Sequence, residues 1–274
     1  MSVKYSFIGV GNISRAILSS METIEGKIKP NCADIYLYDK LPDKTQEFAD
    51  KGYIITKSIE ECIESADYIF LCVKPQNYRE VLEHIRDSGV VLTDKTFVSV
   101  AAGISTSQIC ECLGADYAVI RTMPNTPMTI GCGVCAICHN NFVNSKRFEL
   151  ICRILSSKAE LIKLDESMMN KIIGITSSSP AYVYSFIDAL YDAAKSEGFD
   201  DPRILDLICK VFIGSAQMVL QSDKDIKDLI RAVKSPNGTT ERALNVFESD
   251  GLSNTIVKAV KECNKRADTL GDEM

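Results

Sequence analysis

The sequence predicts an α/β protein in which a doubly wound parallel sheet is followed by an all-helical domain. In the first half, short apolar runs such as Tyr5–Val10 and Tyr68–Val73 alternate with stretches of helical periodicity such as Asn12–Met21. This alternation is typical of parallel sheets whose crossovers are helices. The apolar runs are nearly continuous, which fits strands covered on both faces. From Asp165 onward no run reads as a strand, so we expect domains over residues 1–163 and 164–274.

The expected elements of the first half follow one another along the chain. Each strand is a short run rich in β-branched and aromatic residues, and each helix repeats its apolar residues at a spacing of three or four. The expected strands are Tyr5–Val10, Ile35–Tyr38, Tyr53–Thr56, Tyr68–Val73, Phe97–Ala101 and Tyr117–Arg121, with a strand-like run at Gly133–Ile137. The expected helices are Asn12–Met21, Lys44–Lys51, Ile59–Ser65, Tyr78–Ser88 and Ser107–Leu113.

The second half is a series of amphipathic helices. Apolar residues from Ile204 to Val219 fall on one face of a long helix, and Asp225–Lys234 and Thr240–Glu248 are shorter helices. These helices carry many apolar positions for a domain of this length. We therefore expect a partner surface, most simply a homodimer built through these helices.

Length and composition exclude several classes of protein. The chain has 274 residues and a net charge of −6, which argues against nucleic acids and anionic membranes as partners. No apolar run approaches the roughly 18 residues that span a bilayer. The N-terminus lacks the pattern of a signal peptide, so we expect a cytoplasmic protein whose eleven cysteines are reduced thiols.

The strongest chemical motif is a glycine turn between the first strand and the first helix. Gly9 permits the tight turn, Gly11 lets the backbone approach a pyrophosphate, and Ser14 takes the place of the usual third small residue. The helix that follows offers free N–H groups and the positive end of its dipole. The motif predicts a dinucleotide site of the Rossmann type, with contacts from Gly9, Val10, Gly11, Asn12 and Ile13.

Asp39 ends the second expected strand. An acidic residue at this place typically binds the adenosine ribose 2′-hydroxyl and favours NAD. Lys40 and Lys44 are close enough in sequence to accept a 2′-phosphate instead, and Asp39 could also be a turn residue. Both NADH and NADPH therefore remain open as cofactors.

Other strand ends complete the predicted cofactor crevice. The carboxyl ends of parallel strands line the ligand site of a doubly wound sheet, and small residues there let a flat ring lie against the backbone. Asn125 is held in a rigid loop between two prolines, either as a contact or as part of a structural turn. The expected contacts are Val73, Lys74, Pro75, Ala101, Ala102, Gly103 and Asn125.

Three cysteines and a histidine have the sequence spacing of a metal or haem motif. Cys132, Cys135 and Cys138 are spaced as in iron–sulfur proteins, and His139 completes a haem-attachment string. On a strand, however, Cys135 would point away from the other two. We expect neither metal nor haem here, and His84 is the only other histidine, which argues against a histidine triad.

Two hydroxyl-rich segments stand at expected helix starts. Ser177–Ser179 precedes Pro180, and Ser235 begins Ser-Pro-Asn-Gly-Thr-Thr. Hydroxyls and free N–H groups at a helix start are suited to a small carboxylate, although each segment could be an ordinary N-cap. A hydrolase is not expected, because no Gly-x-Ser-x-Gly turn and no partner base accompany the serines.

Taken together, these motifs make the chain similar to the pyrroline-5-carboxylate reductase family. The resemblance spans essentially the whole chain and keeps the order of the motifs. The segments that carry it are FIGVGNIS from Phe7, CVKPQ from Cys72, VSVAAGIS from Val98, RTMPNTP from Arg121, SSSPAYVYSFIDALYDAA from Ser177 and SPNGTTERAL from Ser235.

The resemblance implies an N-terminal Rossmann domain, a C-terminal helical dimerisation domain and reduction of L-1-pyrroline-5-carboxylate to L-proline with NADPH or NADH. Such dimers often assemble further into decamers. The substrate residues that it implies are Ser177, Ser178, Ser179, Gly238, Thr239 and Thr240. Thr240 is the expected catalytic residue, because it matches the threonine that donates a hydrogen bond to the ring nitrogen.

The chain departs from the family pattern at a few positions. Ser177 and Ser179 replace two glycines, Asn237 replaces another, and Ile59 stands where many relatives have asparagine. A serine would be strained if its position required a positive φ, whereas asparagine tolerates that conformation. Two alternatives therefore stay open: a β-hydroxyacid-type dehydrogenase using Lys171, and a non-catalytic dinucleotide-binding sensor.

Overall fold

The structure is a computed structural model that describes residues 2–24 and 30–273. Its internal contacts divide the chain into two compact units. Unit 1 combines Met1–Ser178 with Glu262–Met274, and unit 2 is Ser179–Lys261. The last strand ends at Lys163, where we expected the first domain to end, but the chain up to Ser178 still packs in unit 1.

Unit 1 is built on one sheet of eight strands in the order β3-β2-β1-β4-β5-β6-β7-β8. The strands are β1 (Tyr5–Ile8), β2 (Ile35–Tyr38), β3 (Ile54–Ile55), β4 (Tyr68–Leu71), β5 (Thr96–Ser99), β6 (Ala118–Pro124), β7 (Gly133–His139) and β8 (Ala159–Lys163). The first six pair in parallel, as predicted, and the chain reverses its winding direction between β1 and β4. In folds of this kind the ligand crevice lies at that reversal.

The sheet departs from the predicted parallel arrangement at one edge. β7 runs antiparallel to β6, and β8 is parallel to β7. Only the short turn Thr126–Ile130 separates β6 from β7. A parallel pair needs a crossover of about a dozen residues or more, so such a short connection can join only antiparallel neighbours.

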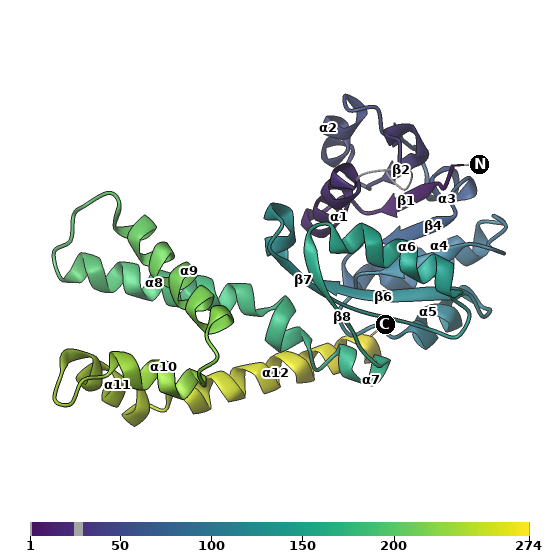
Figure 1. Cartoon of the computed structure of the whole chain (residues 1–274). Helices are drawn as coiled ribbons and strands as arrows, with labels where there is room; N and C mark the ends of the chain where they lie inside the picture. The colour runs from purple at the N-terminus through teal and green to yellow at the C-terminus, as the bar shows by residue number, and fades with distance from the viewer. Residues whose placement is uncertain (1, 25–29, 274) are drawn as a thin grey trace. The chain divides into compact units, whose positions relative to one another are not determined.

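Helices cover both faces of the sheet (Figure 1). Successive residues of β1 show the alternation, because Phe7 packs in one core and Ile8 in the other. The first core also contains the apolar faces of α1 and α6, and the second those of α3, α4 and α5. The helices of this unit are α1 (Asn12–Thr23), α2 (Gln46–Ala49), α3 (Ile59–Glu64), α4 (Tyr78–Asp87), α5 (Thr106–Leu113), α6 (Ser145–Ser156) and α7 (Glu166–Met169).

A third, smaller core joins the end of the chain to the sheet. It contains Met123 of β6, Met169 of α7 and Ala267 of α12 (Leu252–Asp272). The helix comes so close that a Cβ on Gly103 would overlap the carbonyl oxygen of Ala267, and Gly103 also has a φ of +82°. The Gln108 side chain then donates a hydrogen bond to the carbonyl of Gly271 at 2.8 Å. The end of α12 is therefore part of unit 1.

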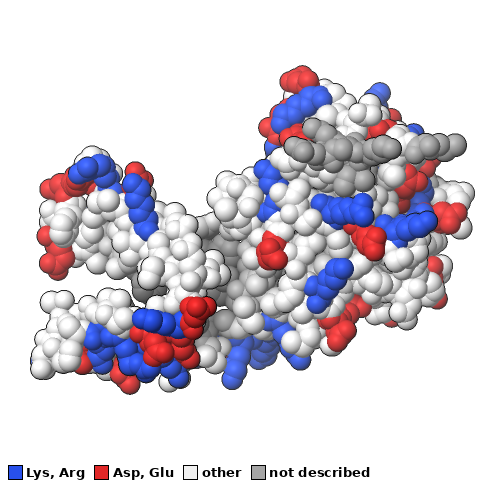
Figure 2. All heavy atoms as spheres, in the orientation of Figure 1, with Lys and Arg blue, Asp and Glu red and all other residues white. Residues whose placement is uncertain are grey.

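Unit 2 consists of α8 (Ser179–Ser196), α9 (Ile204–Gln221), α10 (Ile226–Val233), α11 (Thr239–Ser249) and the beginning of α12. All of its residues are described, and none is buried. Large apolar side chains such as Val211, Leu220 and Val233 are 64%, 84% and 69% exposed. Figure 2 shows extensive uncharged surface over α8 and α9. Helices with this much exposed apolar surface need a protein partner to be stable in water.

One described helix, α9, is long and apolar enough to cross a membrane by length and composition alone. The expectation that no apolar run approaches this length missed α9, in which Asp206 and Lys210 interrupt the run. A helix whose apolar face packs against another protein passes the same test.

Replacing Gly103 by alanine should destabilise unit 1 more than the same change at Gly89. Both glycines have a positive φ, but nothing lies near a Cβ on Gly89, whereas a Cβ on Gly103 meets α12. We expect Gly89→Ala to cost about 1–2 kcal/mol of the free energy of unfolding, and Gly103→Ala about 2–4 kcal/mol. Urea denaturation at equal protein concentration measures both. Equal losses would show that the contact with α12 is not tight.

Candidate active site

The glycine turn after β1 is fixed by neighbouring strands. Gly9 has a φ of +93°, and a Cβ at this position would lie 2.8 Å from the carbonyl oxygen of Cys72. Its N–H donates to the carbonyl of Tyr38 at 2.8 Å. Only glycine fits between the ends of β1 and β4, as the motif predicted.

Gly11 leaves the start of α1 open. It is the N-cap residue, and nothing lies within 4 Å of the place that a Cβ would occupy. Gly11 has no side chain and cannot cap the first turn, so the first N–H groups of α1 receive no hydrogen bond from a cap side chain and carry the positive end of the helix dipole. Ser14 is buried and donates to the Gly11 carbonyl at 2.8 Å, so the third small residue serves packing. The turn fits a pyrophosphate.

Asp39 follows β2 and braces this turn. Its Oδ2 accepts a hydrogen bond from the Val10 N–H at 2.7 Å, and its Oδ1 accepts one from the Leu41 N–H at 2.9 Å. Lys44 Nζ lies 3.6 Å from Oδ2, and the Asp39 side chain is 8% exposed. The role as a turn residue is confirmed by the bond to Leu41, and the contact with a ribose stays a prediction.

Tyr78, which the sequence did not single out, ties together the two strand ends that carry the other expected cofactor contacts. Its hydroxyl donates to the carbonyl of Leu71 at 2.5 Å and lies 3.1 Å from the Ser99 hydroxyl. Complete burial raises the pKa of Tyr78, so the hydroxyl keeps its proton as a donor. Val73–Pro75 follows the first of these strands and Ala101–Gly103 the second.

Gly103 has a packing role that we did not expect, and its contact with the cofactor stays a prediction. We expected it to let a flat ring lie against the backbone; on the side where a Cβ would stand, the end of α12 lies against it. The glycine is needed for this helix contact and for its positive φ.

Asn125 was expected to contact the cofactor, but its amide group is engaged within the protein. Nδ2 donates to the carbonyl of Thr176 at 3.0 Å, and Oδ1 accepts from the Val134 N–H at 2.9 Å. The side chain is almost fully buried. Asn125 therefore braces the segment before Ser177, and the two prolines around it fix its backbone.

The expected carboxylate-binding serines begin in a π-helical turn, η5 (Ile173–Ser177). Such turns are frequent at functional sites. Asn264 of α12 clamps the turn, because its Oδ1 accepts from the Gly174 N–H and its Nδ2 donates to the Lys171 carbonyl, both at 2.9 Å. The Cys263 thiol donates to the Ser178 hydroxyl at 3.3 Å. The loop is thus held from β6 on one side and from α12 on the other.

The serines that replace glycines are not strained. Among the described residues other than glycine, only Asp94 and Asn237 have a positive φ. Ser177 and Ser179 lie in helical backbone, so the possible strain does not arise. Asn237 has a φ of +55°, which confirms that asparagine adopts the left-handed conformation in place of a glycine.

Gly238 and Thr240, in unit 2, form the start of α11. Gly238 is the N-cap, and a Cβ there would overlap the Ser235 hydroxyl. The N–H of Asn237 donates to the Glu241 carboxylate at 2.8 Å, which fixes the entry into the helix. Among the described residues, the Thr240 hydroxyl has no hydrogen-bond partner, and the side chain is half-exposed. It is available as a donor.

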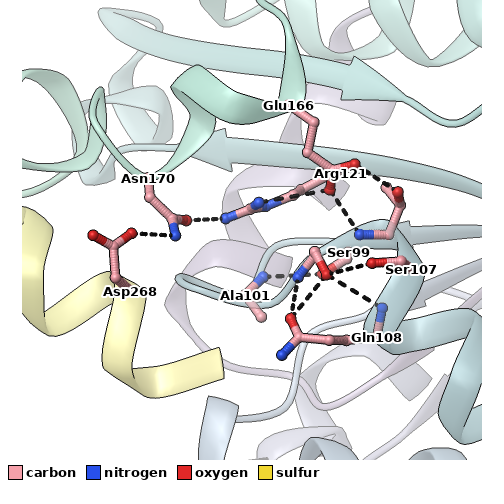
Figure 3. A network of polar contacts seen from close by, with 10 residues as sticks. Ser99, Ala101, Ser107, Gln108, Arg121, Glu166, Asn170 and Asp268 are labelled. Atoms are coloured by element: carbon pink, nitrogen blue, oxygen red, sulfur yellow. Dashed lines mark hydrogen bonds and ion pairs between the residues drawn. The ribbon is translucent and has the colours of Figure 1, made fainter. Parts of the chain in front are cut away.

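A buried arginine, which we did not predict from the sequence, holds the segment that leads into the π-turn (Figure 3). Arg121 of β6 is 2% exposed and reaches Asn170 through Nη2 and Glu166 through Nη1, the latter at 3.7 Å. Glu166 also accepts from the backbone and hydroxyl of Thr106 at 2.7 and 2.6 Å, and Asn170 donates to Asp268 of α12 at 2.8 Å. Burial lowers the pKa of Arg121, and Glu166 opposes this shift.

The cysteine motif does not converge on one point. Cys135 packs in the core beneath α1 and α6, whereas Cys138 packs in the third core beside α7. Cys132 lies before β7 and is exposed. The alternation along the strand separates the thiols, as we expected.

Comparison with known proteins agrees with these features. The model of the pyrroline-5-carboxylate reductase dimerisation family matches residues 166–270, and a model described as NADP oxidoreductase, coenzyme F420-dependent, matches residues 4–103. The pyrroline-5-carboxylate reductase of Escherichia coli strain K12 is 33% identical over 271 residues, which cover 98% of this chain and 99% of that protein. The chain belongs to the pyrroline-5-carboxylate reductase family.

Solved structures of the family are also similar. A Plasmodium falciparum pyrroline carboxylate reductase with NADP bound has a TM-score of 0.88 and 26% identity, with 98% of each chain covered. A Streptococcus pyogenes 1-pyrroline-5-carboxylate reductase has a TM-score of 0.87 and 25% identity, with 97% of this chain and 98% of that chain covered. The family has therefore kept this fold at low sequence identity.

Asn264→Ala should loosen the π-turn without unfolding the sheet. The change frees the Gly174 N–H and the Lys171 carbonyl, so we expect faster amide hydrogen exchange in a peptide covering residues 171–178. Peptides from β1 and β4 should keep their exchange rates. Asn254→Ala, on the exposed part of the same helix, is the matched control. Unchanged exchange at residues 171–178 would contradict the clamp.

The buried thiols should resist alkylation. Burial raises the pKa of Cys62, Cys135 and Cys138 to about 12 each. At pH 8 only about one such thiol in ten thousand would be ionised, and the thiolate is the reactive form. Mass spectrometry after iodoacetamide treatment at pH 8 should find Cys132 labelled, and the other three labelled only in urea. Rapid labelling of Cys135 in the native protein would contradict its placement.

Proposed function

We propose that this protein reduces L-1-pyrroline-5-carboxylate to L-proline by hydride transfer from NAD(P)H, the final step of proline biosynthesis. One observation carries the proposal: an open glycine turn, shaped for a pyrophosphate, in a chain that matches the reductases over nearly its whole length. The P. falciparum relative with NADP bound supports a nicotinamide cofactor. We expect neither a metal nor a haem to take part.

The proposed cofactor residues lie in unit 1. Gly9–Ile13 would hold the pyrophosphate, and Asp39 the adenosine ribose. The strand ends Val73–Pro75 and Ala101–Gly103 would line the rest, with Asn125 bracing the loop beside them. When bound, a reduced nicotinamide supplies a hydride.

The proposed substrate residues supply orientation rather than strong acid catalysis. Ser177, Ser178 and Ser179, with the backbone of Gly238 and the hydroxyl of Thr239, would bind the carboxylate. Thr240 would donate a hydrogen bond to the ring nitrogen, so that C5 of the imine faces the hydride donor. The cyclic imine becomes protonated in water, so the protein needs no strong acid of its own. This agrees with a chain that has only two histidines.

The dimerisation family to which α8–α12 are matched supports a homodimer formed through these helices. The exposed apolar side chains of unit 2 would be covered in that dimer. Assembly into a decamer and a cytoplasmic location, with no nucleic acid or membrane partner, are further predictions.

The two alternative functions are less well supported than the reductase. The sensor hypothesis rested on strained serines, and Ser177 and Ser179 adopt helical backbone. The dehydrogenase hypothesis needs Lys171 as its catalytic lysine, but the Lys171 carbonyl helps hold the π-turn, and the hypothesis gives no role to the segment 235–240.

The direct test is a spectrophotometric assay at 340 nm with pyrroline-5-carboxylate and either NADPH or NADH. We expect substrate-dependent oxidation of at least one cofactor and proline as the product. Cofactor binding without any turnover would instead favour the sensor.

Thr240→Ala should lower kcat by about 100-fold, a typical loss for one positioned donor, while the cofactor Kd stays within about twofold. Thr240→Ser keeps the hydroxyl and should recover most of the activity. Steady-state kinetics and calorimetric titration with the cofactor measure the two effects. Full activity of Thr240→Ala would remove this hydroxyl from the mechanism.

A further inference from the structure

We infer that the adenosine end of this site selects a ribose 2′-hydroxyl over a 2′-phosphate, so that NADH is the preferred cofactor. The inference rests on the proposed function, because it concerns the same nicotinamide dinucleotide. It is argued from Asp39 and the charges around it, all of which lie in unit 1.

Asp39 is held in one orientation at the end of β2. Two backbone N–H groups, from Val10 and Leu41, donate to its two oxygens at 2.7 and 2.9 Å. Val10 belongs to the turn that would hold the pyrophosphate, so the carboxylate is fixed relative to the cofactor's phosphates. A carboxylate has about four acceptor positions, and two N–H bonds leave room for a ribose hydroxyl.

A 2′-phosphate would meet this carboxylate as a like charge. It carries close to two negative charges at neutral pH, and Asp39 cannot turn away without giving up its bonds to the glycine turn. Binding of NADPH would therefore either bring two like charges together or break the hydrogen bond that holds the glycine turn. NADH, whose ribose hydroxyl donates to the carboxylate, incurs neither cost.

The nearby cations do not reverse this preference, because each is matched by an acid. Lys44 lies 3.6 Å from the Asp39 carboxylate. Arg15 pairs with Glu47, donates to the Lys44 carbonyl at 2.9 Å and lies over the Phe48 ring.

The remaining charges of this segment are also balanced. Lys40 and Asp43 are both exposed and carry opposite charges. The three cations Arg15, Lys40 and Lys44 are equal in number to the three acids Asp39, Asp43 and Glu47. A site for a 2′-phosphate needs an excess of positive charge, and these six residues provide none.

The test is calorimetric titration of the purified full-length protein with NADH and with NADPH. We expect the Kd for NADPH to be at least about tenfold higher than the Kd for NADH, a difference of about 1.4 kcal/mol. An equal or lower Kd for NADPH would overturn the inference and leave the reductase proposal intact. Binding of neither cofactor would overturn both.

Variants identify the residue responsible. Asp39→Asn removes the charge but keeps an acceptor for the Val10 N–H. The ratio of the Kd for NADPH to the Kd for NADH should therefore fall about tenfold. Lys44→Met leaves the carboxylate without its counter-ion and should raise the ratio. A general loosening of the turn would weaken the binding of both cofactors alike and would leave this ratio unchanged.

Asp43→Asn is the matched control, since it makes the same charge change on an exposed side chain in the same segment. We expect it to change the ratio by less than about twofold, because exposed charges are screened by salt. A shift as large as that of Asp39→Asn would overturn the assignment to Asp39.

Discussion

The arrangement around the π-turn depends on one buried cation. The guanidinium of Arg121 lies inside unit 1, where a charge without partners would be very costly. Glu166 and Asn170 must therefore stay beside it, and these two residues belong to the segment that leads from the sheet into η5. Asn170 in turn is bonded to Asp268 of α12. A single charge on β6 thus fixes the position of α7, the start of the π-turn and the end of the last helix.

The part of the candidate site in the π-turn is held in place by this arrangement and by two further asparagines. Asn125 holds the π-turn from the end of β6, and Asn264 holds it from α12. The glycine turn after β1 is braced independently, by the Tyr38 carbonyl and by the Asp39 carboxylate. Groups proposed to orient a small substrate and a cofactor are thus positioned by backbone contacts and short amide side chains, which lose little conformational entropy on binding. That property suits a reaction in which orientation matters more than acid–base strength.

The parts of this architecture that depend on local sequence could be predicted from it, and those that depend on distant contacts could not. The glycine turn, the first six strands and the left-handed Asn237 each follow from a few adjacent residues. Helix α6, which we did not expect, also has local signals, namely Asn144 as its cap and apolar residues at Phe148, Ile151 and Leu155. In contrast, the bracing role of Asn125, the clamp at Asn264 and the packing role of Gly103 arise from partners far away in sequence. No periodicity or motif specifies which carbonyl an asparagine will reach.

The division of the chain has a consequence for the order in which the protein can fold. Unit 2 is inserted in the sequence of unit 1. The chain leaves unit 1 after Ser178 and returns to it at Glu262, and these two places are adjacent because Ser178 and Cys263 are in contact. The N-terminal part of a chain emerges first from the ribosome, so the strands can pair early. The third core, however, lacks Ala267 until the whole helical insertion has been synthesised. The π-turn can therefore take its final form only after α12 has been synthesised, and the nascent sheet must stay soluble with that surface uncovered.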